Sequence, residues 1–237
     1  MNSLEKLKKE MLAMANPEKA KLMAKYFQVY PGGYGEGDAF IGLTVPAQRD
    51  LSRRYFKDLS LEQSAELLLS KIHEERLTAV FILVLKYARA KNEAEKEQIV
   101  KAYIESIKGV NNWDIVDSSA HKILGPFLEN KDKSLLYDFL DSGDLWKQRV
   151  AIIATMHYID RRNYTDIFIM AEKMLNHKHD LIHKALGWML REVGKKDFNA
   201  EYDFLAKHYK KMPRTMLRYA IEKFDEELRR RFLKGEI

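Results

Sequence analysis

The chain has 237 residues, of which 46% are hydrophobic and 32% charged, a balance that is typical of a soluble helical protein. Cysteine is absent, which excludes disulfides, thiol catalysis and cysteine-held iron–sulfur clusters. No apolar run approaches the ~20 residues needed to span a bilayer, and the first residues carry no apolar signal core. We therefore expect one domain over residues 1–237, or two small ones packed as one, in a cytoplasmic protein without membrane contact.

The formal net charge is +6, and much of the excess lies in one block. Between Leu181 and Ala220 nine Lys or Arg residues stand against four Asp or Glu residues, a difference of five positive charges in forty residues. A local excess of this kind suits a polyanion through counterion release. A solvated surface helix explains the charges equally well, so charge alone leaves both readings open.

Apolar residues recur at helical spacing along the chain, and no stretch alternates as a strand does. Helix starts are marked by Asn16-Pro17, by Thr44-Val45-Pro46, by a capping box from Ser60 to Gln63 and by Asp180 as an N-cap. The predicted helices cover residues 4–15, 17–29, 45–56, 61–70, 73–90, 93–108, 113–122, 132–141, 144–159, 163–175, 181–193, 199–210, 214–223 and 225–233. The predicted class is all-α.

A repeat is visible along the chain from Arg76 onward. A basic residue followed at once by an apolar run begins at Arg76, Arg149, Lys184 and Arg218, with gaps of 73, 35 and 34 residues. The first gap is two periods, and its midpoint falls near Trp113. Two helices per period predict a right-handed solenoid of HEAT-like helical repeats. The second helix of each pair is expected to line a concave basic face.

At the midpoint, the basic residue is replaced by the segment that starts at Trp113. Trp113 and Asp117 are four residues apart and share one helix face. Asp114 lies in the first turn, where an acid complements the helix dipole. Asp117 lies a turn further in, where capping no longer explains it. It is either a reactive carboxylate or an ion-pair partner for Arg149.

The predicted helix over 181–193 has an apolar stripe that starts at Ile182, and a different set of residues on the other side. Lys184, Trp188 and Arg191 fall on that other side at spacings of three and four. Tryptophan is commonly a core residue, but Trp188 shares a face with cations. The spacing therefore favours a ligand-facing indole, with core packing as the alternative.

These segments resemble one known family. Asn112-Trp113-Asp114-Ile115-Val116-Asp117-Ser118 is similar to the Trp-Asp-x-Val-Asp-Ser segment of AlkD-type DNA alkylation repair proteins. Leu145-Trp146-Lys147-Gln148-Arg149 and the segment 182–192 resemble two further family segments in the same order and spacing. Residues 16–26, ending at Tyr26, resemble the N-terminal stretch, so the resemblance covers nearly the whole chain.

The resemblance implies that Asp117 is the catalytic carboxylate and that Trp113 and Trp188 contact the lesion or its deoxyribose. It further implies a phosphate contact by Arg149 and a position near DNA for Tyr26. The basic stripe on duplex DNA is expected to contain Arg76, Arg149, Lys184, Arg191 and Arg218. The chain departs from the family pattern at Thr44, where the family has glutamine, and in the long, glycine-rich segment 30–38.

The predicted function is therefore hydrolysis of the N-glycosidic bond of cationic N3- or N7-alkylated purines in double-stranded DNA. The predicted enzyme is a monomeric DNA glycosylase that needs no metal and no cofactor. One alternative is a non-catalytic HEAT-repeat protein that binds distorted or branched DNA. The other is a protein-binding HEAT scaffold, whose groove would need apolar anchors in place of a cationic stripe.

Two other patterns were weighed against simpler explanations. The spacing of three histidines, His177, His179 and His183, resembles that of metal ligands. However, Asp180 suits an N-cap, and no second acidic ligand follows. The glycines from Gly32 to Gly37 lack the Gly-Lys-Ser/Thr ending of a phosphate-binding loop. That segment is interpreted as a flexible connector. An approach of its backbone to DNA is the only binding role that it is expected to have.

Overall fold

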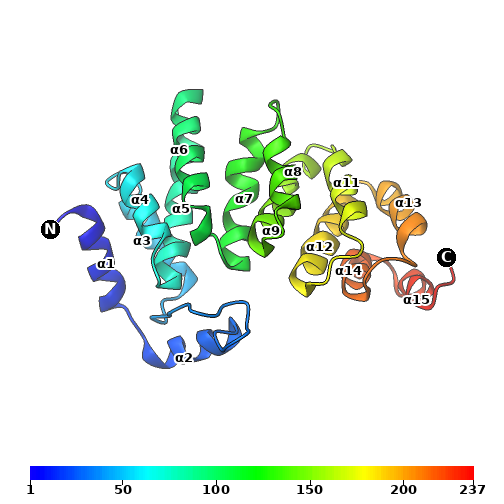
Figure 1. Ribbon diagram of the computed structural model, residues 1–237, viewed down its shortest axis with the longest axis horizontal. Helices are drawn as coiled ribbons and strands as arrows, with labels where there is room; N and C mark the ends of the chain where they lie inside the picture. The colour runs from blue at the N-terminus through cyan, green and yellow to red at the C-terminus, as the bar shows by residue number, and fades with distance from the viewer. The chain divides into compact units, whose positions relative to one another are not determined.

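The computed structural model describes all residues, 1–237, and confirms the all-α class. Its only strand-like pairing is an isolated parallel bridge between Ala39 and Ile72. No helix has both the length and the apolar character that crossing a membrane demands. The α-helices in Figure 1 are α1 (Ser3–Ala13), α2 (Pro17–Tyr26), α3 (Val45–Tyr55), α4 (Leu61–Leu68), α5 (His73–Arg89), α6 (Glu93–Glu105), α7 (Trp113–Phe127), α8 (Ser134–Asp141), α9 (Leu145–Ala154), α10 (Met156–Ile159), α11 (Thr165–Lys173), α12 (Asp180–Lys196), α13 (Phe198–His208), α14 (Arg214–Ala220) and α15 (Glu226–Lys234). Two short 3-10 helices, η1 (Ile107–Gly109) and η2 (Ile221–Lys223), complete the set.

Local capping chemistry sets most helix starts. The predicted capping box is present in α4, where Ser60 and Gln63 exchange side-chain-to-backbone hydrogen bonds. Asn16 caps α2 ahead of Pro17, as predicted. The N-cap predicted at Asp180 is wrong by one residue. His179 is the cap, its Nδ1 accepting the Leu181 N–H at 3.1 Å, and Asp180 is the first helical residue.

Two helices differ most from the prediction in extent. The helix expected to end at residue 122 continues to Phe127, with Pro126 in its last turn. A proline there removes a single backbone hydrogen bond at the frayed end, so the helix tolerates it. The helix expected over 144–159 is interrupted at Thr155, whose hydroxyl donates to the Ile152 carbonyl at 2.6 Å. Such back-bonding competes with the helical ladder and bends helices.

The chain divides into two compact units, Met1–Ser119 and Ala120–Ile237, with the boundary inside α7. In the first unit α5 is the central helix, and all residues from His73 to Leu83 are buried. Helices α3, α4 and α6 pack around it. The segment that joins α2 to α3 crosses the start of α5, where the Glu74 carboxylate accepts the backbone N–H groups of Gly42 at 2.8 Å and Leu43 at 3.2 Å.

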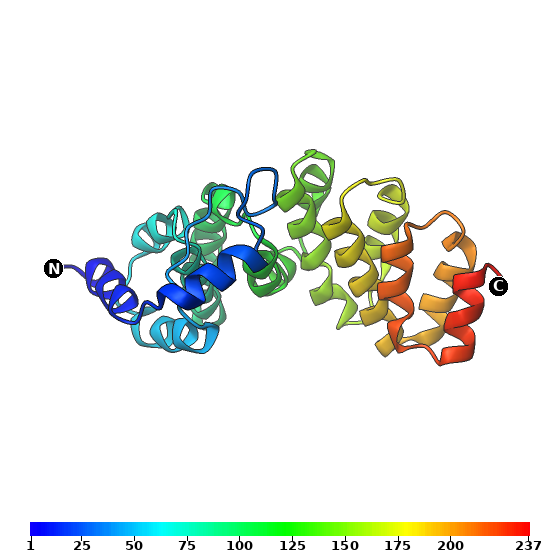
Figure 2. The same ribbon diagram turned by 90° about the horizontal axis from the view of Figure 1, so that it is seen from below.

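The second unit is built from helical pairs. Helices α9, α12 and α14 are the second members of successive pairs, and α12 packs against both of the others (Figures 1 and 2). The period of 34–35 residues read from Arg149, Lys184 and Arg218 thus corresponds to consecutive helices of one layer. This stacking is that of a solenoid of helical repeats. Its right-handed turn and concave basic face stay predictions.

Candidate nucleic-acid interface and active site

Trp113 is the first residue of α7, and its half-buried indole is held on several sides by residues 26–34. Its ring stacks on Phe27 with centroids 5.3 Å apart and planes 15° apart. Tyr26 meets it edge-on at 6.1 Å. The indole Nε1 donates to the Tyr34 hydroxyl at 3.3 Å, and that hydroxyl donates to the Tyr26 carbonyl at 3.2 Å. Because ring face, ring edge and N–H each have a partner, the plane of the indole is defined within the first unit.

Asp117 lies one turn after Trp113 on the same face of α7, and its side chain is half-buried. Val116 and Ala120 are fully buried on the opposite side of the helix. An indole and a carboxylate four residues apart on one face are neighbours on a helix surface. The structure thus brings together Trp113, Asp117 and Tyr26 in the first unit, as the resemblance implies.

A network of buried charged groups surrounds the start of α5 and α7. The imidazole of His73 is fully buried, with Nδ1 at 3.2 Å from Asp38 and Nε2 at 2.8 Å from Asp114. Arg76 pairs with the other Asp38 oxygen at 2.6 Å. Burial lowers the pKa of His73, but the hydrogen bonds that its ring donates to Asp114 and Asp38 outweigh burial and the pKa is raised. Burial in turn raises the pKa of Asp38, and its bonds to His73 and Arg76 bring it below the ordinary value.

The basic stripe differs from its prediction at Arg76. This side chain is only 3% exposed, and besides pairing with Asp38 its guanidinium donates to the Ser70 carbonyl at 2.9 Å. Arg76 is therefore an interior residue of the first unit, and a DNA contact by this side chain stays a prediction. The physical reason is the central position of α5, which has no solvent-facing side over its first three turns.

In the second unit, Arg149 is also mostly inside. It is 5% exposed, and its guanidinium donates to the Leu181 carbonyl at 2.6 Å, which braces α9 against the start of α12. A phosphate contact by Arg149 stays a prediction. Arg218 on α14 is, by contrast, exposed. The four basic residues that share one sequence pattern therefore occupy two different environments.

On α12, Trp188 is half-buried and its Nε1 donates to the Glu192 carboxylate at 2.8 Å. The cations on this face are accompanied by acids. Lys184 pairs with Asp180 at 2.7 Å, Lys195 pairs with Glu192 at 2.6 Å, and Arg191 forms an ion pair with Glu222. The face that sequence spacing predicted is present, but its positive charge is partly balanced within the unit.

The three histidines near the start of α12 have local hydrogen bonds. His179 is the helix cap, and a ring nitrogen of His183 lies 2.6 Å from the His177 carbonyl. A ring nitrogen of His177 lies 3.1 Å from the Gln148 side-chain oxygen. These bonds join α9, the loop and α12, and they explain the histidines as structural residues of the second unit.

Sequence reasoning did not single out Phe27 and Tyr34, which contact Trp113, or His73 and Asp38, which pair with each other behind them. Asp114 was interpreted only as a first-turn acid, and its bond to His73 was missed. The segment 30–38, interpreted as a flexible connector, contributes Tyr34 and Asp38 to this cluster. Its glycines have a packing reason: a Cβ at Gly35 would overlap the Phe27 carbonyl oxygen. No sequence signal links partners that are 35 to 79 residues apart.

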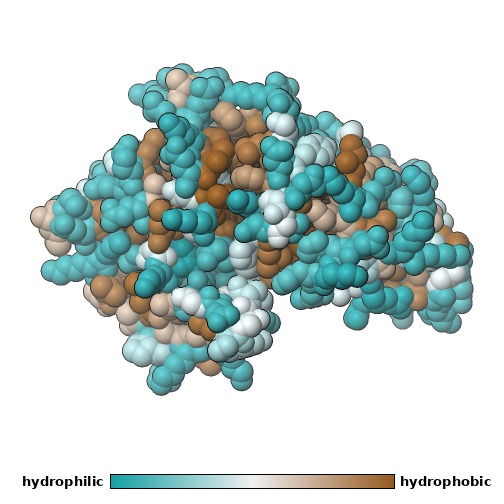
Figure 3. All heavy atoms as spheres, in the orientation of Figure 1, coloured by the Kyte–Doolittle hydropathy of each residue, from teal (hydrophilic) through white to brown (hydrophobic).

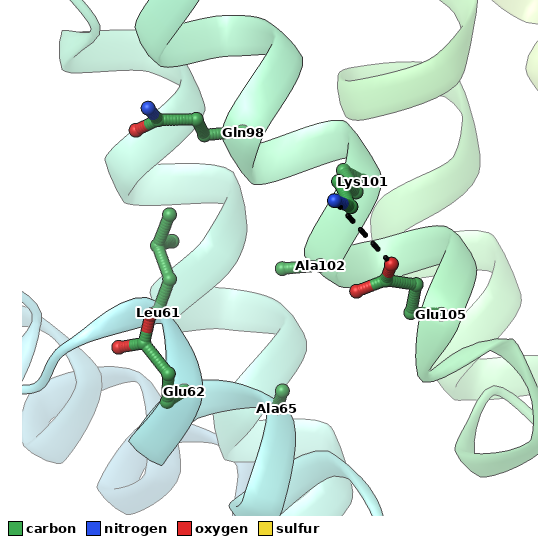
Figure 4. Close-up of a pocket in the computed structure, with 7 residues that line it drawn as sticks. All are labelled: Leu61, Glu62, Ala65, Gln98, Lys101, Ala102 and Glu105. Carbon is green, nitrogen blue, oxygen red and sulfur yellow. Dashed lines mark ion pairs between the residues drawn. The ribbon is translucent and has the colours of Figure 1, made fainter.

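A groove lies elsewhere in the first unit. It has a volume of about 550 Å³ between α4 and α6 and is lined by Leu61, Glu62, Ala65, Gln98, Lys101, Ala102 and Glu105 (Figure 4). Lys101 and Glu105, which face each other at 3.8 Å, give it charges of both signs. None of the predicted site residues lines it. The face seen in Figure 3 is mostly hydrophilic, with smaller hydrophobic areas between the helices.

Stacked helical pairs of this kind define a helical-repeat protein. The chain belongs to the DNA alkylation repair enzyme family, whose sequence profile matches residues 7–224. A similar solved structure is a predicted DNA alkylation repair enzyme from Enterococcus faecalis, with a TM-score of 0.69 and 18% identity. The match covers 90% of this chain and 98% of that one. No curated protein sequence matches the chain.

Proposed function

We propose that this protein is a DNA glycosylase that hydrolyses the N-glycosidic bond of cationic N3- or N7-alkylated purines in duplex DNA. The observation that carries the proposal is the pair on α7: an indole held in a defined plane and a half-buried carboxylate one turn away. Membership of a DNA alkylation repair family supports the assignment. Trp188 of the second unit is the proposed second indole at the lesion.

The proposed reaction requires few catalytic groups from the protein. An alkylated purine carries a positive charge, so it leaves as a neutral base when the C1′–N bond breaks with the bonding electrons on nitrogen. Positive charge then develops on the deoxyribose, where the Asp117 carboxylate stabilises it electrostatically. Water adds to C1′ and loses its proton to the carboxylate or to solvent. Because the leaving group is already activated, the proposed reaction requires no metal and no cofactor.

The indoles favour a cationic base over a neutral one. The face of a tryptophan attracts a nearby cation by about 0.5–2 kcal/mol. Trp113 has one ring face on Phe27, so a lesion would approach its other side or its edge. The same attraction disappears when the base leaves as a neutral molecule, which assists product release.

Binding of the duplex is proposed to involve Lys184, Arg191 and Arg218 of the second unit, with Tyr26 of the first. Lys184 and Arg191 pair with Asp180 and Glu222 in the free protein. Exposed ion pairs such as Lys184 with Asp180 are worth only about 0–1 kcal/mol, so a phosphate can replace the Asp180 carboxylate at small cost. The proposed protein acts as a monomer.

Replacing the reactive carboxylate tests the proposal. Asp117→Asn keeps the size of the side chain and removes the charge, so we expect DNA affinity within about twofold of wild type. We expect excision to fall at least 100-fold, since removing one electrostatic group from a preorganised site costs about 10²–10³ in rate. The measurement is single-turnover release of N7-methylguanine from a methylated duplex.

A matched control is Asp160→Asn, which removes the same charge from an exposed ion pair with Lys196. It should excise at the wild-type rate. Near-wild-type release by the Asp117 variant would overturn the role of Asp117. No release by the wild-type chain, together with tight binding of branched DNA, would overturn the glycosylase assignment and favour a non-catalytic DNA-binding protein.

A further inference from the structure

We propose that His73 is a positioning residue for Trp113: it joins Asp38 of the segment 26–40 to Asp114 of α7, and thereby fixes the plane of the indole. The proposal rests on the proposed function only in placing Trp113 at the lesion. The contacts by which His73 positions the indole are those of the free protein. His73 touches neither DNA nor the reacting atoms, and it acts through its neighbours.

Both ring nitrogens of His73 face carboxylates. Nδ1 lies 3.2 Å from Asp38 and Nε2 lies 2.8 Å from Asp114, and the imidazole is fully buried. A carboxylate only accepts hydrogen bonds, so two such contacts require a proton on each nitrogen and hence an imidazolium. The charged groups around the ring are Asp38 from the loop, Asp114 from α7 and Arg76 from α5. Two positive and two negative charges balance, as a buried cluster requires.

An unbroken aromatic stack connects this cation to the indole. The His73 ring lies on Phe40 at 4.6 Å and 21°, and it also contacts Phe27 at 4.7 Å. Phe27 in turn stacks on Trp113 at 5.3 Å and 15°. The imidazole is therefore one ring away from the indole. A shift of His73 changes the position of Phe27, against which one indole face is packed.

The same histidine anchors the polypeptide segment that carries the remaining contacts of Trp113. Its backbone N–H donates to the Ala39 carbonyl at 2.8 Å, and the Ala39 N–H donates to the Lys71 carbonyl at 3.0 Å. Asp38, held by the ring, is four residues from Tyr34, whose hydroxyl receives the indole N–H. Asn112 adds a bond of 3.4 Å to Asp38 and accepts the Trp113 backbone N–H at 2.8 Å. The segment 26–40 and the start of α7 are therefore both held at His73.

The first test needs no substitution. Nitrogen-15 NMR of the imidazole, assigned through the backbone, reports whether one or both ring nitrogens are protonated. We expect both ring nitrogens of His73 to be protonated at pH 7 in the free chain, because each of them faces a carboxylate. A neutral ring at pH 7 would overturn the proposal, because a neutral imidazole donates to only one carboxylate.

The second test removes one link. Asp114→Asn keeps the shape and the Oδ1 that accepts the Ile115 N–H at 2.9 Å, but loses the charge facing His73. In a chain with Trp146→Phe and Trp188→Phe, Trp113 is the sole indole. We expect its near-ultraviolet circular dichroism to fall at least twofold and its acrylamide quenching to rise at least twofold. Unchanged signals in a folded variant would overturn the proposal.

Glu75→Gln is the matched control. It weakens another ion pair of the first unit, Glu75 with Lys8 at 3.3 Å, in which the Glu75 side chain is 5% exposed against 14% for Asp114. We expect it to lower stability while leaving the indole signals unchanged, which separates positioning from general loosening. In the chain with all tryptophans, Asp114→Asn should reduce the single-turnover excision rate about tenfold with DNA affinity within twofold. If Asp114→Asn changes the signals of the Trp113 indole but the wild-type chain excises no base, the role of His73 stands and only the glycosylase assignment is refuted.

Discussion

Glu201 on α13 is an acid in the interior of the second unit. It is 2% exposed, and its carboxylate lies against Gly194 of α12, where a Cβ would overlap it. Burial raises the pKa of Glu201 to about 8, with Glu192 adding to the rise and Arg191 opposing it. In the unfolded chain the pKa is about 4.3. The folded protein therefore keeps a proton at neutral pH that the unfolded chain has lost.

The sign of the stability change follows from this difference. Between about pH 4.3 and 8 the folded state binds more protons at Glu201, so its stabilising contribution falls as pH rises, on the order of 1.4 kcal/mol per pH unit. Glu201→Gln cannot ionise. We expect its free energy of unfolding, relative to wild type, to increase from pH 5 to pH 8, as measured by urea unfolding. Exposed Glu227→Gln should show no such trend, and parallel pH profiles for wild type and Glu201→Gln would contradict the assignment.

At the residue scale, the sequence pattern did not anticipate the burial of Arg76. Its motif, a basic residue before an apolar run, is the same as at Arg218. The two differ because α5 is surrounded by other helices, whereas Arg218 is exposed on α14. The partner that makes burial of Arg76 tolerable is Asp38, far away in sequence. A local sequence pattern predicts which residues share a helix face. It does not predict which residue of a distant loop pairs with one of them.

At the scale of helices, the contact between α12 and α14 depends on a glycine. A Cβ at Gly187 would overlap the Met216 carbonyl oxygen and the Tyr219 Cβ. Gly187→Ala gains about 1 kcal/mol of helix propensity, but overpacking costs typically 1–3 kcal/mol. Because backbone atoms of α14 are among the obstacles, we expect a net loss of about 1–2 kcal/mol in urea unfolding. If the variant is at least as stable as wild type, α14 moves away from the added methyl group at little cost and the expected loss of stability is wrong.

Most elements were predictable because their signals are local. Capping residues such as Asn16 and Ser60 lie within three residues of the groups that they bond. The segment between α2 and α3 was not predictable in the same way. Its order comes from Glu74 and His73 on α5, more than thirty residues away. The glycines that suggested flexibility are in part places where backbone passes close to backbone.

At the scale of the whole chain, the net charge of +6 is the property most relevant to a polyanionic partner. We expect Arg218→Ala to weaken binding to damaged and undamaged duplexes alike and to make the salt dependence shallower by about one unit. The measurement is DNA binding titrated across salt concentrations. Lys101→Ala removes the same charge from α6, outside the proposed interface, and should leave the slope unchanged. Equal slopes for both variants and wild type would remove Arg218 from the interface.

Helix α2 stands apart from the other elements of the first unit. None of its residues is buried, Leu22 is 70% exposed and Tyr26 is 66% exposed (Figures 1 and 2). Its start is held by the cap at Asn16, whose N–H also reaches the Ile41 carbonyl at 2.8 Å. In evolutionary terms, packing places almost no restriction on an exposed side chain such as Leu22, whereas Tyr26 is also restricted by its contact with the Trp113 ring. Among relatives that keep the cap, resistance to change at Leu22 records selection for binding, whereas free drift there indicates that no ligand rests on it.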